Sequence, residues 1–146
     1  DSIVQYYHEW LDQDGYPFWS FWENIQTWWD IRDLPNVMLI HFSALKKDMP
    51  GEIRRIAEFL DIPIDETKWD EILHHCSFDY MKANATPAVP LGGVFWDGGA
   101  EQFIYKGENG RWRDTLSEIE SAKYENLAAA ELGDECAHWL ATGEMP

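Results

Sequence analysis

Only one short segment of this 146-residue chain has the pattern of a buried β-strand, and helical spacing fills most of the remainder. The segment is VMLIHF, residues 37–42, an apolar run that is rich in β-forming side chains and bounded by turn residues. Because both of its faces are apolar, we predict a central strand of the kind found in a parallel sheet. The sequence therefore predicts a mostly helical chain built around one strand.

Amphipathic helices are predicted on both sides of this strand. Apolar side chains recur at helical spacing over residues 3–11, ending near DGYP, and again over residues 18–29. Later helices are predicted to begin at three N-cap residues, which are Asp48, Asp65 and Ser77. Ser117 and Glu120 form an S-x-x-E capping box. We expect the helix that they open to end at Gly133, before a last short helix.

The segment from Thr86 to Gly110 differs from the rest, since it holds two prolines and six glycines and has no helical period. We predict a long irregular loop, and such loops in compact domains are usually functional or disordered. Phe95 and Trp96 belong to no helical stripe, so we expect them in a lid over an apolar acceptor pocket, to which His41 is a further candidate. Core packing is predicted for three other tryptophans, Trp22, Trp28 and Trp69.

The charge of the chain restricts its partners. It has 27 acidic and 11 basic residues and a formal net charge of −16, which argues against nucleic acid or an anionic membrane surface as the general partner. Any anion that it binds must therefore be held by a local group of basic residues.

Such a group lies in FIYKGENGRW, residues 103–112, with one more arginine directly after it. Gly107 and Gly110 allow the backbone to approach a ligand, and Lys106 supplies a compact positive charge that suits a phosphate. Arg111 and Arg113 add two further cations. The pattern is not a Walker A motif, and a glycine turn with solvated basic side chains is the alternative that the spacing leaves open.

Other kinds of site and compartment are disfavoured. Cys76 and Cys136 are too few for a disulfide framework, and free thiols in a reducing cytoplasm are the simpler interpretation. His74 and His75 precede Cys76 on a predicted helix, where neighbours point about 100° apart, so we expect no metal site. No apolar run approaches the roughly 20 residues of a membrane span. The chain begins at Asp1 without an initiator methionine or a signal-peptide pattern, and we expect it to be part of a longer protein.

Three segments carry a family pattern in a fixed order. They are WWDIRDLPNVMLIHFSALKKDMPGEIRRIAEFLDIP, HHCSFDYMKAN and FIYKGENGRWRDTLS. The second resembles a T-S-F-x-x-M-K-x-N segment and the third an R-K-G-x-x-G-D-W-K segment of the sulfotransferases that use 3′-phosphoadenosine 5′-phosphosulfate (PAPS). This resemblance runs over residues 18–117. It implies an α/β fold, the C-terminal half of a P-loop-NTPase-like sulfotransferase domain, with residues 1–146 forming a single partial domain.

The resemblance also implies contacts with the nucleotide. Lys106 and Gly107 match positions that hold its 3′-phosphate, whereas Tyr105 stands where the family has an arginine. A tyrosine cannot reproduce the bidentate phosphate contact of an arginine, so Arg111 or Arg113 would have to compensate. The other matched positions, which lie around the adenine or approach the nucleotide, are Cys76, Ser77, Phe78, Met81 and Phe42.

The activity implied by the resemblance is sulfuryl transfer from PAPS to a hydroxyl or amine of a small molecule, lipid or sugar. The family's phosphosulfate-binding segment and catalytic histidine belong to its N-terminal half, and residues 1–146 contain neither pattern, so no catalytic residue is assigned. We expect this fragment to be inactive until the missing half or another chain completes it. A non-catalytic binding or assembly module is the alternative. Both interpretations predict self-association, because a sheet edge and apolar faces would be left uncovered.

Overall fold

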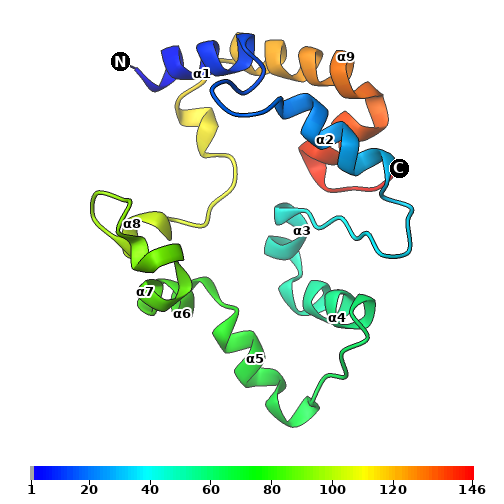
Figure 1. Cartoon of the computed structure of the whole chain (residues 1–146), viewed down its shortest axis with the longest axis vertical. Helices are drawn as coiled ribbons and strands as arrows, with labels where there is room; N and C mark the ends of the chain where they lie inside the picture. The colour runs from blue at the N-terminus through cyan, green and yellow to red at the C-terminus, as the bar shows by residue number, and fades with distance from the viewer. Residues whose placement is uncertain (1) are drawn as a thin grey trace. The chain divides into compact units, whose positions relative to one another are not determined.

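The computed structural model of this chain describes residues 2–146, which form α-helices and short 3-10 helices (Figure 1). In chain order the elements are α1 (Ile3–Asp12), α2 (Phe21–Asp30), α3 (Phe42–Lys47), α4 (Met49–Phe59), η1 (Glu66–Lys68), α5 (Trp69–His75), α6 (Phe78–Ala83), α7 (Ala85–Ala88), η2 (Pro90–Gly93), α8 (Ala100–Phe103), η3 (Arg111–Asp114) and α9 (Glu118–Thr142).

The chain divides into two compact units. Unit 1 contains the residues up to Lys47 together with Gly110–Pro146, and unit 2 contains Asp48–Asn109. The single partial domain expected from the sequence stays a prediction, since two compact units can belong to one domain.

The predicted central strand at residues 37–42 is wrong. Residues 37–41 have no regular secondary structure, and Phe42 is the first residue of α3. A strand needs backbone hydrogen bonds to a neighbouring strand, and the described part of the chain contains no strand with which to pair. The N–H of Val37 donates instead to the carbonyl of Leu34 at 2.9 Å. The apolar run is also only partly covered, since Leu39 packs against the core of unit 1 while Ile40 is 40 % exposed.

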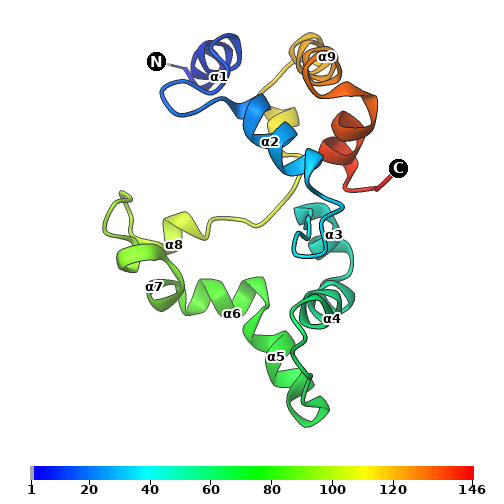
Figure 2. The same ribbon diagram turned by 45° about the vertical axis from the view of Figure 1, so that its right-hand side comes forward.

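The core of unit 1 lies where α2 packs against α9 (Figures 1 and 2). Its buried residues, which come from α1, α2 and α9, are Leu11, Trp22, Trp29, Ala128, Leu132 and Cys136. Trp22 is buried as predicted, with its ring centroid 5.7 Å from that of Tyr124 on α9, and burial raises the pKa of the Tyr124 hydroxyl. Trp28 is 53 % exposed, so its predicted place in the core is wrong. The adjacent Trp29 occupies the buried side of α2 instead.

Local signals at the helix starts are confirmed. At each of the three predicted N-caps, the side-chain oxygen accepts a hydrogen bond from a backbone N–H two or three residues later. The pairs are Asp48 with Gly51, Asp65 with Thr67, and Ser77 with Tyr80. Asp65 begins the 3-10 turn η1, which leads into α5. The second helix starts at Phe21 rather than at residue 18, because Ser20 caps it.

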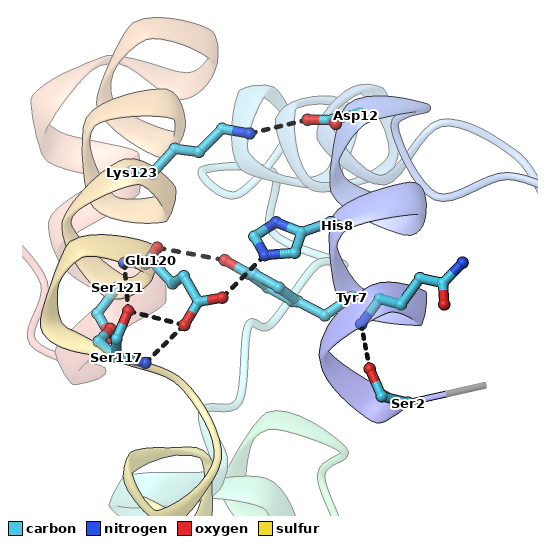
Figure 3. A network of polar contacts seen from close by, with 9 residues as sticks. Ser2, Tyr7, His8, Asp12, Ser117, Glu120, Ser121 and Lys123 are labelled. Carbon is cyan, nitrogen blue, oxygen red and sulfur yellow. Dashed lines mark hydrogen bonds and ion pairs between the residues drawn. The ribbon is translucent and has the colours of Figure 1, made fainter.

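Polar contacts attach α1 to the start of α9 (Figure 3). The N–H of Ser117 donates to Glu120 Oε2 at 2.7 Å, and the N–H of Glu120 donates to Ser117 Oγ at 3.3 Å, which confirms the capping box. These hydrogen bonds from Ser117 hold the pKa of the Glu120 carboxyl below its ordinary value. The other oxygen of Glu120 lies 2.8 Å from His8 Nε2, and Lys123 Nζ lies 2.9 Å from Asp12 Oδ1. The capping box is therefore also an anchor for α1.

Helix α9 is kinked at Gly133, and Figure 1 shows that its ribbon is not straight. The dihedral angles of Gly133 are φ +74° and ψ 165°, which lie outside the helical region. A residue with a side chain rarely adopts such a positive φ, so glycine is required at the bend. The predicted end of a helix at Gly133 is confirmed, and the predicted last helix follows as the second part of α9.

Unit 2 contains a small second core inside the segment that was predicted to be an irregular loop. Three short helices, α7, η2 and α8, lie wholly or partly in that segment, so the prediction is wrong for much of it. Ala85, Val89 and Ala100 are buried together, and Trp96 and Ile104 pack against them. Helices of about four residues are too short to show a period in the sequence. None of the helices within residues 2–146 is long and apolar enough to cross a membrane.

Candidate functional site

Two segments of unit 2 that are distant in the sequence meet at Gly107. A Cβ atom added to Gly107 would lie 2.6 Å from Cδ2 of Phe78, so the backbone of Gly107 packs directly on that ring. Gly107 also has a φ of +60°, a conformation that side chains disfavour. The sequence-predicted residues Phe78 and Gly107 are thus brought together by a contact that only glycine allows.

Lys82 forms a second connection between the same two segments. Its Nζ donates a hydrogen bond to the backbone carbonyl of Tyr105 at 2.6 Å and lies 5.7 Å from the centroid of the Phe78 ring. Lys82 was not among the residues predicted for the site, although it is the lysine of the matched M-K-x-N pattern. That pattern was the available signal, but the partner of Lys82 could not be found from the sequence.

Ser77 sets the start of α6 and hence the position of Phe78. Its hydroxyl donates to the carbonyl of His74 at 2.7 Å and accepts from the N–H of Tyr80 at 3.2 Å. Cys76 directly precedes this cap and is exposed, and Met81 is 37 % exposed on the same helix. The candidate adenine-side residues therefore cluster at the beginning of α6.

Lys106 is exposed and carries the positive charge of the candidate site. Its Nζ lies 5.3 Å from the centroid of the Tyr105 ring, and that ring is 42 % exposed. An ammonium at this distance from an aromatic ring is attracted by the ring's electrons. Tyr105 thus gives Lys106 an aromatic neighbour, where an arginine would have given the site a second cation.

The two aromatic residues proposed for the acceptor side differ in their surroundings. Phe95 is 73 % exposed. Trp96 packs against the small core of unit 2, with its ring centroid 4.5 Å from that of Phe103. The core therefore anchors Trp96, while Phe95 remains accessible to a ligand.

Three predicted site residues, His41, Phe42 and Arg111, belong to unit 1. The ring of His41 accepts a hydrogen bond from the N–H of Ser43 at Nδ1 and lies 3.0 Å from the carbonyl of Leu140 at Nε2. A carbonyl only accepts hydrogen bonds, so this arrangement places the proton on Nε2. Phe42 is 52 % exposed at the start of α3, and Arg111 is exposed at the start of η3.

The two histidines that were considered for metal binding have their rings next to that of a tyrosine, Tyr80. The rings of His74 and His75 lie 4.9 Å and 4.5 Å from that of Tyr80. No group of three or more histidine, cysteine or acidic side chains among residues 2–146 is arranged to hold a metal ion. The structure therefore assigns these rings a packing role between α5 and α6.

Comparison with known proteins identifies the family to which these segments belong. The sulfotransferase domain model matches residues 1–135. This chain belongs to the sulfotransferase family. The resemblance stated from three segments is thereby confirmed.

The sulfotransferase match extends to individual relatives, although each is much longer than this chain. Luciferin sulfotransferase of Photinus pyralis is 36 % identical over an aligned length of 104 residues, and the match covers 62 % of this chain and 28 % of that protein. Sulfotransferase 1B1 of Mus musculus is 30 % identical over 109 residues, 73 % of this chain and 36 % of the relative. Sulfotransferase 1C2 of Homo sapiens is 24 % identical over an aligned length of 146 residues, and the match covers 87 % of this chain and 49 % of that protein. This chain thus spans about half or less of these relatives.

Solved structures share the fold of this sulfotransferase chain. The mouse sulfotransferase SULT7A1 complexed with PAP matches with a TM-score of 0.78 at 19 % identity, over 99 % of this chain and 53 % of that one. A retinol dehydratase in complex with androsterone and the inactive cofactor PAP matches with a TM-score of 0.75 at 27 % identity, over 92 % of this chain and 39 % of that one. The predicted sulfotransferase fold is therefore confirmed, except for the strand at residues 37–42.

Proposed function

We propose that this chain contributes the adenine and 3′-phosphate side of a PAPS site, for sulfuryl transfer to a hydroxyl or amine acceptor. The observation that carries this proposal is the packing of the Gly107 backbone on Phe78, which brings the phosphate-side segment to the adenine-side segment within one unit. The PAP bound in two proteins of similar fold supports the same assignment.

The chemistry of these residues suits such a ligand. Lys106 is an exposed ammonium, and a lysine offers three donors and a full charge to phosphate oxygens. The positive φ of Gly107 allows the neighbouring backbone N–H groups to turn toward an anion. Phe78, Met81 and Cys76 supply apolar surface for a purine ring. The roles of Phe42 and Arg111, which belong to unit 1, stay predictions from the family resemblance.

We propose further that this chain does not complete the reaction by itself. Sulfuryl transfer requires groups that hold the phosphosulfate and accept the proton of the acceptor, and residues 1–146 contain no pattern for either. Completion would come from the remainder of a sulfotransferase domain or from another chain. Phe95 and Trp96 of unit 2 would lie on the side of a small-molecule, lipid or sugar acceptor. No contact among residues 2–146 favours the alternative of a non-catalytic module.

Lys106→Ala is expected to weaken the binding of adenosine 3′,5′-bisphosphate by about 1 kcal/mol or more, roughly fivefold in Kd, because it removes a charged donor to phosphate. Calorimetric titration of both proteins measures this change. Lys68→Ala is the matched control, since Lys68 is an exposed lysine of the same unit, on η1. If the two substitutions weaken bisphosphate binding equally, the effect comes from the change in net charge and not from a contact of Lys106. Absence of binding to the unsubstituted chain would refute the proposed phosphate contact in this chain.

We also propose that copies of this chain associate through apolar side chains in the segment between α1 and α2. Tyr16, Phe18 and Trp19 are 64 %, 71 % and 75 % exposed, which is unusual for adjacent large aromatic residues. Sedimentation velocity should show a sedimentation coefficient that increases with concentration, and more so at high salt, which screens the net charge of −16. The double substitution of Phe18 and Trp19 by serine should reduce the association. A chain that sediments as a monomer at every concentration would exclude it.

A further inference from the structure

We propose that Lys82 is a positioning residue that orients the backbone of residues 105–107 for phosphate binding. This inference rests on the proposed function, because it concerns the same site. Lys82 contacts both matched segments, through the carbonyl of Tyr105 and the ring of Phe78.

Helix α6 places Lys82 within reach of both Tyr105 and Phe78. Phe78 and Lys82 are four residues apart on α6, so their side chains lie on the same face, one turn from each other. Lys82 is partly buried, and its Nζ is 2.6 Å from the Tyr105 oxygen. A hydrogen bond from a charged donor at this distance is among the stronger kinds in proteins.

The bonded carbonyl determines the orientation of the next residue's donor. The carbonyl of Tyr105 and the N–H of Lys106 belong to one planar trans peptide unit, so they point in opposite directions. A hydrogen bond that holds the carbonyl toward Lys82 therefore directs the N–H of Lys106 away from it. Gly107 is held in turn by its contact with Phe78. Lys82 and Phe78 thus fix the residues on either side of Lys106, which are Tyr105 and Gly107.

Positioning of this kind acts mainly on affinity for the 3′-phosphate. Without the hydrogen bond to Tyr105, the segment would have to be ordered when the ligand binds, which costs conformational free energy. The start of α6 should keep its position, because Ser77 caps that helix independently of Lys82, and only the contact of the Lys82 ammonium with the Phe78 ring would be lost. The substitution should therefore affect ligands with a 3′-phosphate and spare those without one.

Lys82→Met tests this, since methionine keeps much of the aliphatic stem and removes the donor. Titration with adenosine 3′,5′-bisphosphate should show a Kd about tenfold higher, whereas the Kd for adenosine 5′-monophosphate should change by less than about twofold. Lys82→Arg, which retains a charged donor, should restore most of the affinity. The midpoint of urea unfolding should stay close to that of the unsubstituted chain. Lys68→Met provides the control for a lost charge.

A double-mutant cycle with Lys106→Ala separates positioning from a direct phosphate contact of Lys82. If Lys82 acts through residues 105–107, Lys82→Met should cost less affinity in the Lys106→Ala background than in the unsubstituted chain, because one of the groups that it positions, the Lys106 ammonium, is gone. Additive losses would overturn the inference, as would equal losses for the two ligands accompanied by a lower unfolding midpoint. Binding that depends on Lys106 but not on Lys82 would overturn the role of Lys82 and leave the proposed function in place. Absence of bisphosphate binding to the unsubstituted chain would overturn the proposed function as well.

Discussion

Trp22→Ala is expected to lower the free energy of unfolding of this chain by about 3–5 kcal/mol, the range for removing a buried tryptophan side chain. Trp22 is 6 % exposed and lies between α2 and α9, with its ring 4.8 Å from that of Phe21 and 5.7 Å from that of Tyr124. Alanine would leave a cavity at the contact that joins these two helices. Since small domains unfold with roughly 5–15 kcal/mol, the loss is a large part of the total.

The matched control is Trp28→Ala, which makes the same chemical change on the same helix. Trp28 is 53 % exposed, so less of its surface is removed from water, and we expect a loss of at most about 1 kcal/mol. Urea denaturation followed by circular dichroism measures both variants without relying on tryptophan fluorescence. Similar losses for the two variants would contradict the assignment of Trp22 to the core and Trp28 to the surface.

Gly107→Ala is expected to raise the Kd for adenosine 3′,5′-bisphosphate by about 100-fold or more and to lower the free energy of unfolding by about 1–3 kcal/mol. Two effects combine at this position. The φ of +60° is unfavourable for alanine, and the new Cβ would lie 2.6 Å from the Phe78 ring. Either the ring or the backbone must move, and each movement displaces Lys106 from the start of α6.

Gly99→Ala separates these two effects. Gly99 also belongs to unit 2 and has a φ of +73°, but a Cβ there would have no atom within 4 Å. This variant should therefore show a similar loss of stability from backbone strain, while nucleotide affinity changes by less than about threefold. Calorimetric titration and urea denaturation of both variants supply the comparison. Full nucleotide affinity in Gly107→Ala would show that the contact with Phe78 does not form the site.

Removing the side chain of Phe78 tests whether the clash with its ring causes the loss of stability in Gly107→Ala. In the double variant Gly107→Ala with Phe78→Ala, the close contact is gone, so part of the stability lost in Gly107→Ala should return. Nucleotide affinity should stay low, since Phe78 is itself assigned to the adenine side. Restored affinity would indicate that Phe78 only obstructs position 107 and makes no contact with the ligand.

The parts of the fold that could be predicted from the sequence depend on neighbouring residues. Asp48, Ser77 and Ser117 begin helices where expected, because a capping hydrogen bond joins residues only two or three positions apart. The bend at Gly133 follows in the same way from the conformational freedom of one residue. The family could also be recognised, since its segments are short and contiguous.

Failures of prediction occurred where a residue's state depends on distant parts of the chain. The apolar pattern of residues 37–42 is typical of a buried strand, yet a strand exists only with a partner, and residues 2–146 provide none. Trp28 and Trp29 are both on or near the apolar face of α2, and only the position of α9 buries one and exposes the other. The short helices within residues 86–110 similarly depend on their packing around Val89 and Ala100.

The helix starts, the negative charge, the local basic segment and membership of the sulfotransferase family all follow from the amino-acid sequence. The packing of Gly107 on Phe78 and the hydrogen bond from Lys82 to the carbonyl of Tyr105 are known from the three-dimensional structure alone. This difference arises because local hydrogen bonds and periodicity are set by residues a few positions apart. Contacts between distant segments depend instead on how the chain folds back on itself, and a one-dimensional pattern does not contain that information.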